Sequence, residues 1–237
     1  MTERTYGLYL ESGPKMRKTM VHVPELFGCI ANGPTTDQAL EATPDAIRRY
    51  LRFLAEHGEA LDAAGPFRTR VVEHVTEGQW LGNGDPTVMF GPDRATPTEA
   101  EIARCAERFR AIREDTLSMV RGLPARRLSA KPNVGRSIGG ILEHLVEPAR
   151  HYIRNVLGPV PELDVVAARM RKGAISPAEA MAEMVEPAVE RLDAMTTEER
   201  TREVPHGAAL WTAGKMLRRL LEHEWEHHEE IRVRLGG

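Results

Sequence analysis

Two histidines four positions apart, His223 and His227, are the residues of this sequence best placed to do chemistry. Side chains four apart lie on the same face of an α-helix. That face also holds Leu220 and Ile231, so we expect both imidazoles to point into a protein interior. Buried imidazoles need hydrogen-bond partners or a metal ion. The acidic neighbours fall on the far side of the helix: Glu222, Glu226 and Glu229.

The same segment matches the bare His-Glu-x-x-His pattern of zinc proteases, with Glu224 in second position. That chemistry needs a third ligand downstream, and no residue beyond Glu230 is a candidate. A metalloprotease is therefore disfavoured. The plain alternative is a pair of histidines at the core edge of a charged helix.

A third histidine changes this balance. His144 lies in the apolar segment 138–145, and His151 follows two turns later. The helical projection puts His144 at the edge of the core face, which suits either a pocket or the surface. Three neutral imidazoles, His144, His223 and His227, would hold a divalent metal and leave coordination positions open.

Four further residues are candidates for the pocket around such an ion. Glu230, one turn from His227, could accept the imidazole N–H. His151 could act as an acid or base. His206 and Trp211, near the start of the last helix, could line the pocket, although packing is an ordinary role for Trp211. The sequence assigns no catalytic residue.

The positions of these residues require helices. Residues 97–237 contain four amphipathic stretches of bundle length, so we expect an all-α four-helix bundle. Capping signals begin the first at Thr96 and the third at Ser176, and Pro187 should bend the third. The second spans about 134–157 and the fourth about 211–235. A linker is expected at 91–97.

Residues 1–92 show a different pattern, typical of a small α+β domain. Alternating segments at 5–10, 18–23 and 67–75 predict strands. Residues 32–34, Asn-Gly-Pro, indicate a turn, and the Thr35/Gln38 spacing indicates the start of a helix.

Composition excludes several classes of protein. The formal net charge is −3, with 32 basic and 35 acidic residues, so nucleic acid is an improbable partner. No apolar stretch is long enough to cross a membrane. Two cysteines cannot form a disulfide framework, and a cytoplasmic location is the default expectation.

Residues 98–236 resemble the DinB-like superfamily of metal-binding four-helix bundles, through the segments 137–145 and 211–231. The resemblance implies that His144, His223 and His227 bind a divalent metal, commonly nickel or zinc. Some members of that superfamily use low-molecular-weight thiols in transferase or isomerase reactions. This chain is therefore expected to be a metal-dependent enzyme of that type, acting on a small molecule.

Residues 5–57 resemble the HicB-like antitoxin fold, through the segments 23–29 and 33–40. The resemblance implies a toxin ribonuclease and operator DNA as partners, but a helical region replaces the usual DNA-binding tail. The alternatives are therefore an antitoxin-like regulatory protein with a structural metal, or a metal-dependent hydrolase. The N-terminal domain could also form a homodimer.

Overall fold

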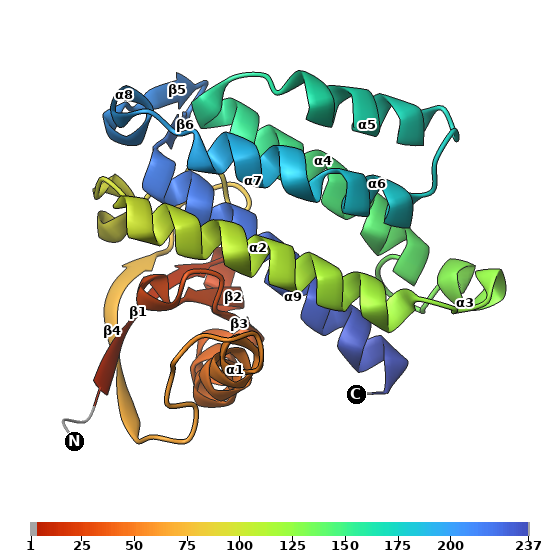
Figure 1. Cartoon of the computed structure of the whole chain (residues 1–237). Coiled ribbons are helices and arrows are strands. Elements are labelled where there is room, and N and C mark those ends of the chain that lie inside the picture. The colour runs from red at the N-terminus through yellow and green to blue at the C-terminus, as the bar shows by residue number, and fades with distance from the viewer. Residues whose placement is uncertain (1–3, 237) are drawn as a thin grey trace. The chain divides into compact units, whose positions relative to one another are not determined.

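A computed structural model describes residues 4–236 of the chain (Figure 1). These residues divide into two compact units. Unit 1 comprises the residues up to Ala95 together with Glu203–Glu222, and unit 2 comprises Thr96–Arg202 and the residues from His223 onward. The expected domains, 1–92 and 97–237, concern independent folding and stay a prediction.

Unit 1 is built on a four-stranded mixed sheet with the order β3-β2-β1-β4. The first three strands are antiparallel, and β4 pairs parallel with β1. The parallel pair is possible because α1 (Thr36–Glu56) provides the connection between the opposite ends of the sheet. The strands are β1 (Arg4–Ser12), β2 (Arg17–His22), β3 (Ile30–Thr35) and β4 (Phe67–Val75).

The turn predicted at residues 32–34 is wrong, because these residues belong to the edge strand β3. A proline is tolerated there, since an edge strand leaves one side of its backbone unpaired. Gly33 has a packing role: a Cβ atom at this position would lie 2.4 Å from the backbone nitrogen of Ala39 in α1. The helix therefore packs directly on the strand, and Thr35 caps it by accepting a hydrogen bond from the Gln38 backbone.

The later part of unit 1 includes the hairpin β5 (Val204–His206) and β6 (Ala209–Trp211) and the first half of α9 (Ala213–Leu235). The segment 91–97, expected to be a linker, contains the 3₁₀ helix η3 (Gly91–Arg94). Its Asp93 is only 2% exposed. The boundary between the two units falls after Ala95, within this segment, and Asp93 packs inside unit 1.

Asp93 belongs to a buried group that we call the charge cluster: His22, Asp93, Arg218, Arg219 and Glu222. Arg218 donates to both oxygens of Asp93, at 2.6 and 2.8 Å, and to Glu222 at 2.9 Å. Glu222 also accepts from Arg219 at 3.0 Å and lies 2.8 Å from Nδ1 of His22. Glu222 was expected on the charged outer face of its helix, and it is 1% exposed instead.

Unit 2 is helical. Helices α2, α6 and α7 contact one another, α4 contacts α6 and α7, and α5 lies beside α4 and α6 (Figure 1). The second half of α9 belongs to this unit. The remaining helices are α2 (Glu99–Val120), α3 (Ala125–Ser129), α4 (Ile138–Leu157), α5 (Pro161–Arg171), α6 (Pro177–Glu183), α7 (Val185–Asp193) and α8 (Thr197–Thr201).

Two of the predicted helices differ from the structure, one in its first residue and one in its continuity. The capping box predicted at Ser176 is confirmed. The first helix is capped by Thr98 with Glu101, two residues later than predicted, because the same Thr-x-x-Glu chemistry recurs there. The third helix is broken into α6 and α7 at Met184, one turn before Pro187, which has no backbone N–H to donate. No signal was recognised for α5.

The coarse fold prediction, a mixed α+β part followed by a helical part, is confirmed. Among the described residues, no helix has the length and apolar character needed to cross a membrane.

Candidate metal centre

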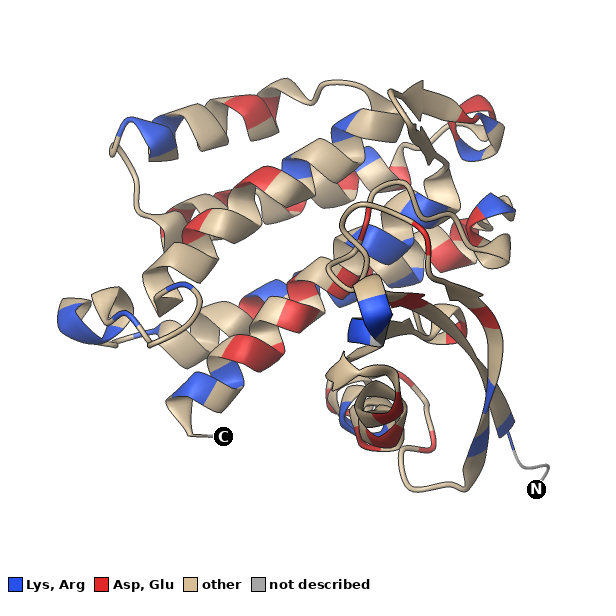
Figure 2. Ribbon diagram, turned by 180° about the vertical axis from the view of Figure 1, so that it is seen from behind, with Lys and Arg blue, Asp and Glu red and all other residues tan. Residues whose placement is uncertain are grey.

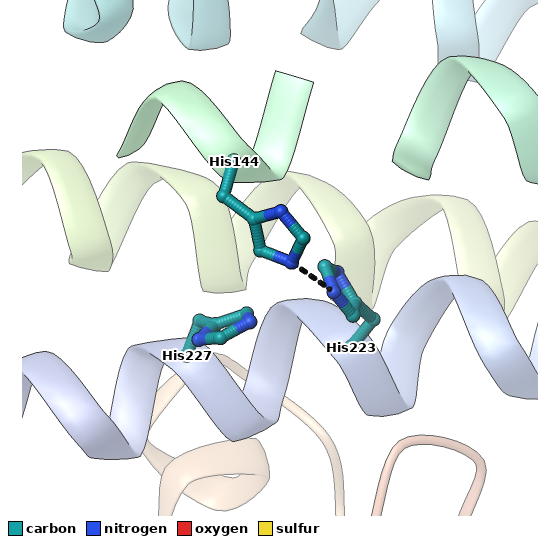
Figure 3. Close-up of side chains that lie close together, drawn as sticks. All are labelled: His144, His223 and His227. Carbon is teal, nitrogen blue, oxygen red and sulfur yellow. Dashed lines mark hydrogen bonds between the residues drawn. The ribbon is translucent and has the colours of Figure 1, made fainter. Parts of the chain in front are cut away.

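Three histidines from two helices meet in unit 2 (Figure 3). His144 projects from α4, and His223 and His227 project from successive turns of α9. We call these three residues the histidine cluster. One ring nitrogen of each lies within 4.8 Å of the others. His223 and His227 are buried and His144 is half-buried, so the cluster has one side nearer to solvent.

The local sequence explains how each ring reaches the cluster. Ser137 caps α4 by accepting from the Gly140 backbone at 3.1 Å, which sets the start of the helix two turns before His144. Residues four apart on α9 stack their side chains along one face, so His223 and His227 reach the same point. Their rings lie 4.7 Å apart between centroids and nearly perpendicular.

The nitrogens of the cluster face one another closely. The Nε2 atoms of His144 and His223 lie 3.1 Å apart. Two nitrogen lone pairs at this separation repel each other unless a proton or a cation lies between them. Nitrogen ligands of a tetrahedral zinc ion, at about 2.0–2.1 Å from the metal, lie about 3.3 Å from each other. The spacing of this pair therefore suits a shared metal ion.

Protonation also favours a cation as the shared partner. Burial, together with the neighbouring His227 and Arg136, lowers the pKa of His144 to about 4. His144 is therefore neutral near pH 7 and keeps a lone pair available. Neutral imidazole is the form that binds metal ions.

Glu230 lies one turn after His227, and its Oε2 is 2.7 Å from Nδ1 of that ring. The bond requires His227 to carry its proton on Nδ1 and donate it, which leaves Nε2 as the nitrogen with a free lone pair. This hydrogen bond is the main cause of the lowered pKa of Glu230, and the charge of Arg234 adds to it. A carboxylate behind a histidine is the common outer arrangement of metal sites.

The surroundings of the cluster are partly aromatic and partly basic. The ring of Tyr152 lies edge-on to His223 at 5.9 Å. Arg234 pairs with Glu230 and donates to the backbone oxygen of Arg136. The segment 124–137, between α2 and α4, carries no acidic residue and is blue without red in Figure 2. Its basic residues are Arg126, Arg127, Lys131 and Arg136.

The remaining candidate residues do not join the cluster. His151 is exposed on α4, and its Nε2 lies 3.1 Å from an Arg150 nitrogen. Burial and the charge of Arg150 lower its pKa. His206 and Trp211 belong to unit 1, in β5 and β6. Trp211 is buried there, with the Lys215 ammonium 4.8 Å above its ring.

Glu224, the acid of the His-Glu-x-x-His pattern, forms a buried ion pair. Its Oε1 accepts from Arg113 of α2 at 2.7 Å, and the two side chains are 2% and 0% exposed. A carboxylate bound in this way cannot serve as the free base over a metal that protease chemistry requires. The pairing therefore supports the sequence argument against a metalloprotease.

Sequence reasoning missed two residues beside the cluster. Arg113 follows Phe109 by four positions and precedes Thr116 by three, so it lies on the apolar stripe of α2, and that spacing was the available signal. His228 lies 2.8 Å from a carboxylate oxygen of Asp115 and stacks on Trp225. No local feature distinguished His228 from the other residues of its charged helix.

A model of the DinB superfamily matches residues 108–231, a span that includes the whole histidine cluster. No curated protein and no solved structure matches the chain.

Proposed function

Because the chain belongs to the DinB superfamily, we propose that it is a divalent-metal-dependent enzyme whose ion is held by His144, His223 and His227. The observation that carries the proposal is the convergence of three ring nitrogens within 4.8 Å. Three neutral nitrogen ligands suit nickel or zinc. The fold expected around this site is a four-helix bundle of α2, α4, α7 and α9.

The reaction we propose is a transfer or isomerisation that uses a low-molecular-weight thiol. When bound, a divalent cation would supply Lewis-acid chemistry, stabilising an anionic ligand such as a thiolate. Two residues of the chain would position the ligands: Glu230 fixes the tautomer of His227, and the ring of Tyr152 packs against His223. The basic segment 124–137 favours a small-molecule substrate that carries negative charge.

Metal content is the direct test of the site. Tag-free protein should contain about one divalent ion per chain by elemental analysis, and His227→Ala should abolish it. His151→Ala is the matched control, since His151 lies on the same helix as His144 but outside the cluster. Full metal occupancy in His227→Ala would contradict the assignment.

Cobalt substitution tests whether a thiol binds to the metal. Cobalt-loaded protein should develop a sulfur-to-cobalt charge-transfer band when a small thiol is added at neutral pH, and His223→Ala should not. A cobalt spectrum that responds to hydroxide but to no thiol would favour the hydrolase alternative. A spectrum that responds to neither would favour a closed, structural metal.

The second candidate is an antitoxin-like regulatory protein with such a structural metal. It is favoured by the order of elements in unit 1, three antiparallel strands followed by a helix and a parallel strand, together with the HicB-like segments. The homodimer is also a proposal. Its support is the edge strand β4, where Val71 and Val72 are each 46% exposed, and its test is the mass in solution by sedimentation.

A cytoplasmic location remains part of the proposal. Cys29 and Cys105 are both buried, and two cysteines are too few for the disulfide frameworks of small secreted proteins.

A further inference from the structure

Arg113 makes three hydrogen bonds from the centre of unit 2. One terminal nitrogen donates to the backbone oxygen of Met181 at 3.1 Å. The other donates to the backbone oxygen of Leu145 at 3.3 Å and to the carboxylate of Glu224 at 2.7 Å. The guanidinium also lies 4.4 Å over the ring of Phe109, and the side chain is 0% exposed.

Two of these three acceptors are direct chain neighbours of the histidine cluster. Leu145 follows His144 in α4, and Glu224 follows His223 in α9. Neighbouring Cα atoms are about 3.8 Å apart, so a shift of either acceptor carries the adjacent imidazole with it. A single guanidinium therefore links the two helices at the turns that present the ring nitrogens.

The turn of α4 that carries His144 needs such a link. Pro148 lies four residues later and has no N–H, so the His144 carbonyl loses its helical hydrogen bond. A helix weakened at this turn has more freedom to bend. The bond from Arg113 to the Leu145 carbonyl fastens the same turn to α2.

Stability alone does not account for this arrangement. A buried ion pair replaced by well-packed apolar residues of similar volume is often neutral or favourable for stability. Arg113 has a planar guanidinium that can address several acceptors in fixed directions. An apolar side chain could fill the same space, but it could not hold these acceptors in fixed directions.

We propose that Arg113 is a positioning residue for the histidine cluster: through Leu145 and Glu224 it sets the separation of His144 from His223. The inference depends on the metal binding proposed above. It predicts that the residue controls metal affinity and coordination geometry separately from its effect on folding.

The test is the double variant Arg113→Met/Glu224→Met, which removes both charges and leaves neither buried alone. We expect a folded protein whose affinity for cobalt, measured by competition with a chelator, falls about 10–100-fold, as for other outer partners of metal ligands. The visible cobalt bands should also change in position or intensity, because they report the coordination geometry.

The control is the double variant Arg191→Met/Glu199→Met. Arg191 donates to the Leu157 backbone oxygen at 2.9 Å and pairs with Glu199, so it is a similar link in the same unit. None of these residues adjoins the histidine cluster. The control should retain the wild-type cobalt affinity and spectrum.

Arg113→Lys provides a second measurement if the double variant does not fold. Lysine keeps the charge opposite Glu224 but cannot reproduce the planar fork, so cobalt affinity should fall by an intermediate factor. Wild-type affinity and bands in whichever variant folds would overturn the inference. Wild-type protein that binds no metal would instead overturn the proposed function, and the two failures are therefore distinguishable.

Discussion

The same helix, α9, carries two buried polar groups of opposite character. Its first half contributes Arg218, Arg219 and Glu222 to the charge cluster of unit 1. Its second half contributes His223 and His227 to the histidine cluster of unit 2. In the charge cluster, two carboxylates meet two guanidiniums and an imidazole. In the histidine cluster, three imidazole rings meet one another.

The difference separates a structural role from a binding role. Every carboxylate of the charge cluster accepts hydrogen bonds from an arginine of the cluster, so each negative charge is paired without any added group. The histidine cluster brings three ring nitrogens together, and a cation could take the place of the proton shared between His144 and His223. Removing a partner should therefore damage folding in the first case and binding in the second.

The largest expected effect is on the charge cluster. Arg218→Ala leaves Asp93 and Glu222 buried with like charge, and should lower the free energy of unfolding by about 3–5 kcal/mol. The measurement is urea denaturation. Arg94→Ala is the control, because the Arg94–Glu203 pair is about half exposed and should contribute roughly 0–1 kcal/mol. Equal losses of unfolding free energy in the two variants would contradict the structural role of the charge cluster.

Acid should weaken the charge cluster in a defined pH range. Burial alone would raise the pKa of Glu222, but the charges of Arg218 and His22 lower it from 4.5 to about 2. The stabilisation, about 3 kcal/mol, is present above pH 4.5 and lost as the pH falls towards 2. In urea denaturation from pH 7 to 2, the advantage of wild type over Glu222→Gln should shrink below pH 4.5. A constant difference would contradict this pKa.

The histidine cluster should affect stability only through its ligand. Zinc at a hundred times its dissociation constant should raise the free energy of unfolding by about 2.7 kcal/mol. Thermal denaturation with and without zinc measures this gain, which His223→Ala should lose and His206→Ala should keep. A gain that persists in His223→Ala would place the zinc elsewhere.

The smallest expected effect concerns the carboxylate behind His227. Glu230→Gln removes a charged acceptor while keeping the shape, and should weaken zinc binding about 10-fold, or about 1.4 kcal/mol. Titration against a chromophoric chelator measures it. The neighbouring Glu229→Gln should leave zinc affinity unchanged, since Glu229 pairs with Arg232. Similar losses in both variants would point to a general charge effect.

Local patterns predicted what depends on local spacing. The four-residue step brought His223 and His227 to one face, and the apolar segment around His144 identified the second helix. The cap at Ser176 followed from side chains three residues apart. By contrast, Thr96 and Thr98 offer nearly the same capping chemistry, so the sequence could not distinguish them.

Long-range pairing limited the prediction elsewhere. Glu222 and Arg218 project from α9 as an ordinary charged face. Only the fold brings Asp93 to Arg218, across 125 residues, and His22 to Glu222, across 200 residues. The buried ion pair of Arg113 with Glu224 could not be predicted for the same reason, since its partners are 111 residues apart. A charged residue is expected at the surface, and the partner that allows its burial lies far along the chain.

The discontinuity of unit 1 has a consequence for the growing polypeptide. Its sheet and η3 are complete by Ala95, yet the unit also requires Glu203–Glu222. At about 5–20 residues per second, the wait between these segments during translation is on the order of ten seconds. Throughout it, Asp93 lacks Arg218 and His22 lacks Glu222, the partners that they contact in the folded unit. The nascent chain therefore carries an unfinished first unit while all of Thr96–Arg202 emerges, an interval in which chaperones have access to its exposed interior.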